Sequence, residues 1–192
     1  MDHSSDKPNA AKNGWQLLST EYPYTHPMFR VRTDLLRWPD GGVRPFSYPV
    51  SGPVVIIVPV TPEGEVVLIR QFRYIVDEWL WELPAGGSHD FEGDDLVDLA
   101  RRELLEEVGG EAEALAYVGD FHPMPGMVHK VFHIYLATGV RLGESRPEPG
   151  EIIEVHPVPV ERALAMAQNG EIADATSAYA LLRCTEYLQS LA

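Results

Sequence analysis

Three glutamates, Glu103, Glu106 and Glu107, stand close together in the stretch RRELLEEVGG. At spacings of three and four residues, the side chains of a helix emerge from one face, so these carboxylates would repel one another. Carboxylate oxygens are the ligands that the hard cations Mg2+ and Mn2+ prefer, whereas zinc favours histidine and cysteine. By spacing alone the cluster fits a solvated helix face better than a metal site, so the choice depends on its surroundings.

The surrounding residues predict an amphipathic helix that holds these acids at the edge of a packed core. Apolar residues recur with helical spacing between Leu96 and Leu104, two aspartates that can cap a helix precede them, and Gly109 and Gly110 follow. Because the apolar stripe would face the core, the acidic face would lie at the boundary between protein and solvent.

A glycine-containing loop precedes this helix, in the segment WLWELPAGG. Gly86 and Gly87 allow the backbone to approach a ligand closely, and the carbonyl of Ala85 can bind a metal ion. Arg102 can hold a neighbouring carboxylate through a charge-assisted hydrogen bond. This combination favours a metal site over a solvated helix face.

The segment from the glycine loop to the end of the helix, GGSHDFEGDDLVDLARRELLEEVGG, resembles the Nudix box, whose usual pattern is G-x5-E-x7-R-E-U-x-E-E-x-G-U with U apolar. The matching residues, in order, are Arg102, Glu103, Leu104, Glu106, Glu107 and Gly109. The pattern's earlier glutamate falls on Asp94, its first glycine falls on Ser88, and Gly110 replaces its final apolar residue. These departures leave the helix that carries the acids intact.

Four segments are similar to the Nudix branch that hydrolyses ADP-ribose and related nucleoside diphosphate sugars: VVLIRQFRY, WLWELPAGG, FHPMPG and GEIADATSAYALL. That branch typically carries a proline about fifteen residues beyond the box, where Pro125 stands. The resemblance implies metal-dependent hydrolysis of the diphosphate bond, which would give AMP and ribose 5-phosphate from ADP-ribose. GDP-mannose or a broader range of nucleoside diphosphate sugars is an alternative. A regulator that binds the nucleotide without cleaving it is an alternative of another class.

The resemblance also implies roles for the acids of the box. Glu103 and Glu107 would be the principal metal ligands, joined by Glu106 and by the carbonyl of Ala85. The ion would be Mg2+, with Mn2+ as an alternative. Glu106, Glu107 and Arg102 would also take part in catalysis.

Enzymes of this branch commonly take a general base from a mobile loop late in the chain. Here that loop is ESRPEPGEIIEV, and its acidic residues are Glu144, Glu148, Glu151 and Glu154. Its position before the following strand favours Glu151. The alternative is that a water held between metal ions needs no separate base.

Substrate phosphates need positively charged partners, and arginine offers planar bidentate contacts. Arg73 and Arg70 lie near the end of a predicted strand that leads toward the glycine loop, although each could instead form a surface ion pair. Glu82 could accept a hydrogen bond from the ribose or the base. The predicted substrate-binding residues are Arg73, Arg70, Glu82, Arg44, Phe46, Pro125 and Gly126.

The order of predicted elements indicates an α/β protein. The resemblance implies a Nudix fold, with a mixed β-sheet sandwiched between helices. We expect residues 1–14 to form a disordered tail, 15–50 an antiparallel β extension that contains a hairpin, and 51–192 the Nudix domain. In the resembled branch such an extension forms a dimer interface, so a homodimer is expected, with a self-contained edge sheet as the alternative.

The composition argues against several classes of protein. With 29 acidic and 15 basic residues and a net charge of -14, the chain lacks the basic surface of a general nucleic-acid binder. The longest apolar run, Val54–Val60, is too short to span a bilayer, and no secretion signal is recognisable, so we expect no membrane partner and a cytoplasmic location. The single cysteine, Cys184, cannot form an internal disulfide and is expected to be a buried structural thiol.

Overall fold

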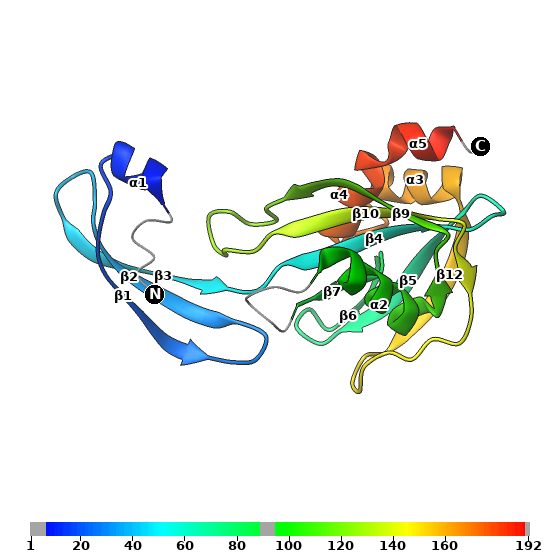
Figure 1. Cartoon of the computed structure of the whole chain (residues 1–192), viewed down its shortest axis with the longest axis horizontal. Helices are drawn as coiled ribbons and strands as arrows, with labels where there is room; N and C mark the ends of the chain where they lie inside the picture. The colour runs from blue at the N-terminus through cyan, green and yellow to red at the C-terminus, as the bar shows by residue number, and fades with distance from the viewer. Residues whose placement is uncertain (1–6, 89–94, 191–192) are drawn as a thin grey trace. The chain divides into compact units, whose positions relative to one another are not determined.

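The computed structural model describes residues 7–88 and 95–190. They form two compact units (Figure 1). The first unit comprises Met1–Gly52 together with Met124–Lys130, and the second comprises Pro53–Pro123 together with Val131–Ala192. The loop Met124–Lys130 was expected in the Nudix domain but belongs to the first unit, because the backbone N–H of His129 donates to the carbonyl of Pro49 at 2.9 Å.

The first unit is built on a three-stranded antiparallel sheet in the order β1-β2-β3. Its strands are β1 (Gln16–Thr25), β2 (Arg30–Arg37) and β3 (Val43–Val50). The predicted hairpin is confirmed, since β2 and β3 pair without a break and Gly41 supplies the positive φ of 84° in the turn. The strand β1 was not predicted separately, since Pro23 interrupts its sequence pattern. Its pairing with β2 carries two register shifts.

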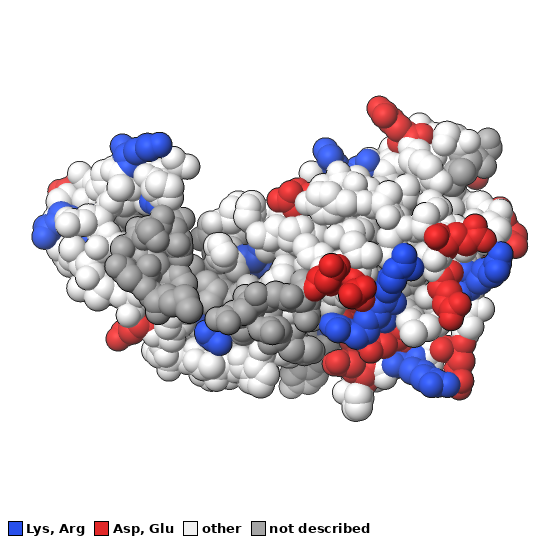
Figure 2. Space-filling model, viewed as in Figure 1, with Lys and Arg blue, Asp and Glu red and all other residues white. Residues whose placement is uncertain are grey.

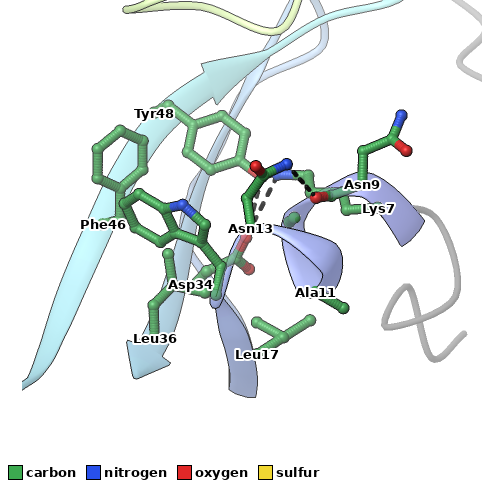
Figure 3. A pocket seen from close by; sticks show the side chains of 11 residues that line it. Lys7, Asn9, Ala11, Asn13, Leu17, Asp34, Leu36, Phe46 and Tyr48 are labelled. Atoms are coloured by element: carbon green, nitrogen blue, oxygen red, sulfur yellow. Dashed lines mark hydrogen bonds and ion pairs between the residues drawn. The ribbon is translucent and has the colours of Figure 1, made fainter. Parts of the chain in front are cut away.

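A short helix, α1 (Pro8–Lys12), lies where a disordered tail was expected, so that prediction is wrong for these residues. Pro8 occupies the first turn, where the backbone N–H that proline lacks would have no hydrogen-bond partner within the helix. The helix is tied to the sheet because Lys7 Nζ donates to the Tyr48 hydroxyl at 2.5 Å. Figure 3 shows the pocket of about 500 Å³ between α1 and the sheet, with Leu17, Leu36 and Phe46 among its lining residues.

The second unit contains a seven-stranded mixed sheet. Its main order is β12-β5-β4-β10-β9, while β6 pairs with β5 and β7 pairs with β4. The strands are β4 (Val54–Val60), β5 (Glu65–Arg73), β6 (Glu78–Glu82), β7 (Ala85–Gly87), β9 (Ala114–Phe121), β10 (Phe132–Thr138) and β12 (Ile153–Pro159). A separate two-stranded pair joins β8 (Gly110–Glu111) to β11 (Arg141–Leu142).

Helices cover both faces of this sheet (Figure 1). On one face, Val55 and Ile57 of β4 pack in a core with α2 (Leu96–Val108). On the other face, Ile56 and Val58 pack in a core with α3 (Val160–Asn169), α4 (Ala175–Arg183) and α5 (Thr185–Gln189). The expected sandwich of helix, sheet and helix is therefore confirmed. Successive apolar side chains of β4 point to opposite faces of the sheet, so both faces must be covered by helices.

The strands β4 and β5 are paired at one residue pair, Val60 and Val66. Beyond that pair, β7 forms a ladder with β4 and β6 forms one with β5. This arrangement places the segment Ala85–Gly87 within the sheet, where its backbone can meet α2.

The C-terminal segment forms two successive helices, α4 and α5. The break falls at Cys184, whose ψ of 5° departs from helical geometry. Cys184 is 4% exposed, which confirms a buried thiol, and burial raises its pKa to about 11.

Candidate active site

The helix that carries the three acids has defined ends and a buried stripe, as predicted. The Asp95 side chain caps its N-terminus by accepting from the backbone N–H groups of Val97 at 2.8 Å and Asp98 at 3.2 Å. Gly109 closes its C-terminus in the left-handed conformation, with φ 64°. The buried residues include Leu99, Leu104 and Glu107, so one of the acids faces into the protein.

Glu107 is 3% exposed, and a carboxylate is rarely buried so completely. Its Oε2 accepts a hydrogen bond from the backbone N–H of Ala85 at 2.9 Å. Burial raises the pKa of Glu107 well above its ordinary value, and the charges of Glu151 and Glu103 raise this pKa further. The bond from Ala85 and the charge of Arg73 oppose the shift. The carboxyl group of Glu107 therefore holds its proton more readily than an exposed glutamate does.

Glu103 lies against the backbone of Gly86. A Cβ at Gly86 would overlap the Glu103 carboxylate, so a side chain there is incompatible with this arrangement. Burial, and then the charge of Glu106, raises the pKa of Glu103 to about 7, while Arg102 opposes the shift. The glycine loop thus lets two carboxylates approach the backbone of β7, as the sequence predicted for Gly86.

Arg73 and Glu82 form a bidentate pair beside these acids. Arg73 Nε donates to Glu82 Oε1 at 2.8 Å, and Arg73 Nη2 donates to Oε2 at 2.5 Å. Glu82 is 5% exposed, while the Arg73 side chain is 43% exposed and lies within electrostatic range of Glu107. Glu82 therefore holds Arg73 in place, a role that the sequence analysis did not assign to it.

Arg70 lies on the other face of β5, so the structure does not support its predicted phosphate contact. Residues alternate along a strand, and Leu68 packs in the core with α3 whereas Ile69 packs in the core with α2. Arg70 therefore lies on the same face of β5 as Leu68. Its guanidinium lies 5.7 Å from the Trp79 ring and 5.9 Å from the Trp81 ring. Arg73 lies on the same face of β5 as Ile69, which is the face that α2 covers.

The loop that supplies the predicted base is fastened to the end of α2. The N–H of Gly143 donates to the carbonyl of Gly109 at 2.8 Å, and the N–H of Arg146 donates to the carbonyl of Glu106 at 2.7 Å. These bonds satisfy carbonyls that a helix end leaves free. A Cβ at Gly109 would approach the Gly143 backbone to 2.6 Å, so only glycine permits this contact.

Glu151 comes from this loop into the same acidic group. The N–H of Phe72 donates to the carbonyl of Ile152 at 3.2 Å, which continues the pairing of β5 with β12 and brings Glu151 beside Arg73. Glu151 raises the pKa of both Glu103 and Glu107, so its carboxylate lies within electrostatic range of each. Its Oε2 accepts from the backbone N–H of Glu148 at 2.9 Å.

Four of the predicted substrate residues belong to the first unit and are described there. Arg44 pairs with Asp40 and lies 4.8 Å from the Trp38 ring, while Phe46 lines the pocket against α1. Pro125 and Gly126 lie in the turn closed by the N–H of Met127 and the carbonyl of Met124 at 2.9 Å. Asp94, which falls on the box's earlier glutamate, lies outside the described residues.

A family model of the NUDIX domain matches residues 50–179 of the chain. The chain belongs to the Nudix family. The chain is 34% identical over 137 residues to an ADP-ribose pyrophosphatase of Bacillus subtilis, covering 70% of this chain and 71% of that protein. It is 34% identical over 138 residues to an ADP-ribose pyrophosphatase of Mycobacterium tuberculosis, covering 72% of this chain and 66% of that protein. A crystal structure described as an ADP compounds hydrolase shares the fold at a TM-score of 0.77 and 20% identity, covering 92% of this chain and 95% of that one.

Nudix hydrolases generally need divalent metal ions, and the residues of this Nudix domain fit such an ion. Among the described residues, no three histidine, cysteine or acidic side chains already form a metal-binding group. The donors nevertheless suit a hard cation: Glu107 is buried, Glu103 is half-buried, both carboxyl groups have raised pKa values, and Gly86 leaves space for the Glu103 carboxylate. With Glu106 and the carbonyl of Ala85, they are the groups that would hold the ion.

Hydrogen bonds from α4 that were not predicted support the segment before the glycine loop of the Nudix domain. Ser177 is 1% exposed, and its Oγ accepts from the N–H of Leu83 at 2.8 Å. The same hydroxyl donates to Asp174 Oδ2 at 2.7 Å, and this aspartate caps α4. In the sequence, a capping aspartate followed three residues later by serine could have indicated the start of α4. Only the fold shows that the Ser177 hydroxyl contacts the segment before Ala85.

The surface of the Nudix domain carries both signs of charge. On the face shown in Figure 2, described acidic and basic side chains are interspersed over the second unit rather than separated into a basic patch. Within the described part of the chain, no helix has the length and apolar character that crossing a membrane requires.

The raised pKa of Glu103 allows a prediction of how the stability of the metal-free protein depends on pH. Its pKa is raised from 4.5 to about 7 in the folded state, so between these values the folded protein keeps a proton that the unfolded chain releases. The contribution of Glu103 to the free energy of unfolding should therefore fall as pH rises through this window. Urea unfolding of the wild type and Glu103→Gln should show the variant gaining stability relative to the wild type from about pH 5 to about pH 7.5. A constant difference would contradict the prediction.

Proposed function

We propose that this protein hydrolyses the diphosphate bond of ADP-ribose or a related nucleoside diphosphate sugar, giving AMP and ribose 5-phosphate from ADP-ribose. The observation that carries the proposal is that two acids of α2 reach the backbone of the glycine loop: Glu107 Oε2 accepts from the N–H of Ala85 at 2.9 Å, and the Glu103 carboxylate lies against Gly86. The charges of Glu151 and Arg73 both act on Glu107. The named relatives, both ADP-ribose pyrophosphatases, support the choice of substrate.

The proposed ion is Mg2+, with Mn2+ as an alternative, held by Glu103, Glu106, Glu107 and the Ala85 carbonyl. Bound there, it would neutralise the diphosphate and polarise its phosphorus. Arg73, fixed by Glu82, offers its remaining guanidinium edge to a phosphate oxygen. Arg102 lowers the pKa of Glu103 and so favours the ionised carboxylate that a cation needs.

In the proposed reaction, the oxygen of a water forms a bond to phosphorus and the P–O–P bridge breaks. Glu151 takes the proton of the attacking water, and the bridging oxygen leaves with one of the two phosphate products. Positioning and electrostatics supply most of the rate in phosphoryl transfer, which is why rigid support of the glycine loop matters.

The test of this function is product analysis of the purified protein. We expect incubation with ADP-ribose and Mg2+ to yield AMP and ribose 5-phosphate, as followed by chromatography. GDP-mannose and NADH, incubated in parallel, measure selectivity. Preferred cleavage of GDP-mannose would show that the preferred substrate is another nucleoside diphosphate sugar, hydrolysed by the same type of reaction. Binding of every nucleotide without turnover, in Mg2+ and in Mn2+, would contradict a hydrolase and indicate a regulator.

Replacing Glu151 by glutamine tests the general base. We expect kcat to fall by about 100-fold or more with little change in KM, because the amide cannot accept the proton. The matched control is Glu144→Gln, in the same loop, whose side chain is 81% exposed and pairs with Arg146. Equal kcat values in the two variants would remove Glu151 from the chemistry.

We also propose that the protein is a cytoplasmic homodimer and that the β extension, residues 15–50, forms its interface. Tyr22 and Tyr24 of β1, and Phe29 in the turn before β2, are all more than a third exposed, and aromatic side chains are enriched at protein interfaces. Light scattering after size-exclusion chromatography should give twice the chain mass. A monomer at micromolar concentration would favour the self-contained edge sheet.

A further inference from the structure

A serine of α4 holds the backbone of the segment that joins β6 to the glycine loop. Ser177 is 1% exposed, and its Oγ accepts from the backbone N–H of Leu83 at 2.8 Å. A hydroxyl has one proton, and Ser177 donates it to Asp174 Oδ2 at 2.7 Å, which leaves its lone pairs for Leu83. Leu83 is also 1% exposed, and buried backbone N–H groups are nearly always paired. Ser177 supplies this partner from a position 94 residues further along the chain.

The segment from Glu82 to Ala85 joins two parts of the candidate active site. At its start, Glu82 accepts the two hydrogen bonds of Arg73 at 2.8 Å and 2.5 Å. At its end, the backbone N–H of Ala85 donates to Glu107 Oε2 at 2.9 Å, and the Ala85 carbonyl is one of the groups proposed to hold the ion. The hydroxyl from α4 contacts the chain between these two ends.

The link from Leu83 to Ala85 is stiff, because its middle residue is Pro84. The proline ring fixes the φ of Pro84 and restricts the preceding residue to extended conformations. The Pro84 carbonyl accepts from the backbone N–H of Ile57 at 2.9 Å, which ties the link to β4. One hydrogen bond leaves a stiff link free to turn about it, whereas a second bond at Leu83 fixes its direction. A shift of Leu83 would therefore be carried to the backbone of Ala85.

We propose that Ser177 is a positioning residue: by holding the N–H of Leu83, it fixes the Ala85 carbonyl at the place where the divalent ion binds. This inference rests on the metal site of the proposed function. Ser177 is buried and bonded within the protein, so it acts through the backbone. Removing a group that orients a metal ligand commonly weakens metal binding by about 10-fold or more.

The first test is metal affinity without substrate, read from the electron paramagnetic resonance signal of free Mn2+. We expect Ser177→Ala, which removes the hydroxyl, to weaken Mn2+ binding about 10-fold. Ser177→Thr keeps a hydroxyl and should restore most of the affinity. The matched control is Ile134→Val, at a fully buried residue that packs in the same core as Leu83. It removes packing but no hydrogen bond, so it should lower the unfolding midpoint and leave Mn2+ affinity unchanged.

Amide hydrogen exchange of the metal-free protein, followed by NMR, is the second test. In Ser177→Ala the N–H of Leu83 loses its acceptor and should exchange faster whether Ser177 is structural or positioning. The proposal requires more: the N–H of Ala85 should also exchange faster than in Ile134→Val, because its bond to Glu107 is disturbed.

Mn2+ affinity of Ser177→Ala within about twofold of the wild type, or unchanged exchange at Ala85, would overturn the proposal. An equal loss of affinity in Ile134→Val would also overturn it, because affinity would then follow stability alone. A Ser177→Ala protein that does not fold would show a structural role instead. A loss of Mn2+ affinity in Ser177→Ala that Ser177→Thr restores, in a protein that cleaves no nucleotide sugar, would support the positioning role while contradicting the proposed function.

Discussion

Replacing Glu107 by glutamine is expected to lower kcat for ADP-ribose by about 1,000-fold, because it removes a charge from the metal site. Glutamine has the same shape, and its amide oxygen can still accept the hydrogen bond from Ala85 that Glu107 Oε2 accepts at 2.9 Å. The fold should therefore survive. In the metal-free protein the variant should be at least as stable as the wild type, since burial disfavours the ionised carboxylate of Glu107.

Steady-state kinetics in Mg2+ measure the expected fall in kcat, and thermal unfolding without metal measures the stability of the variant. The control is Glu113→Gln, an exposed glutamate that pairs with Arg141 outside the acidic group. Activity of Glu107→Gln within tenfold of the wild type would remove Glu107 from the metal ligands. Lost activity together with lost stability would point to a structural role instead.

Gly86→Ala is expected to lower kcat/KM by about 100-fold or more, because the added methyl group would occupy the space of the Glu103 carboxylate. The carboxylate would have to move away from β7 and from the position where the ion is proposed to bind. The backbone itself is not strained by alanine, since Gly86 is not among the glycines with positive φ.

Gly87→Ala is the matched control for this substitution. A Cβ at Gly87 would make an ordinary contact of 3.5 Å with Val54 Cγ2, so this variant should keep most of its activity and stability. Titration with Mn2+ should show weakened metal binding in Gly86→Ala alone. Equal kinetics for the two variants would show that the position of Glu103 against β7 is not needed for catalysis.

The site could be predicted from sequence where its residues are neighbours along the chain. Glu103, Glu106 and Glu107 follow from helical spacing, and the ends of α2 follow from a capping aspartate and a glycine. The Nudix box could be recognised for the same reason, because it is one continuous segment. Glu151 was a choice among four loop acids, and the structure adds that it lies within electrostatic range of Glu103 and Glu107.

The predictions failed where the outcome depended on register or on contacts between distant segments. Arg73 was the first candidate for phosphate binding and Arg70 the second, but strand alternation puts them on opposite faces of β5. The segment 8–12 looked like a tail because its own composition is polar, and its helix is held by the contact of Lys7 with Tyr48 of β3.

By itself the sequence determined the acidic helix, the glycine loop and the alternation of buried strands, because these follow from local spacing and from the conformational limits of single residues. Only the tertiary structure decided that Gly86 lies against Glu103, that Glu82 holds Arg73, and that Ser177 of α4 supports the segment before the glycine loop. The physical reason is that burial and pairing belong to the packed arrangement of strands and helices. Those quantities arise only when segments distant in the chain exclude water together.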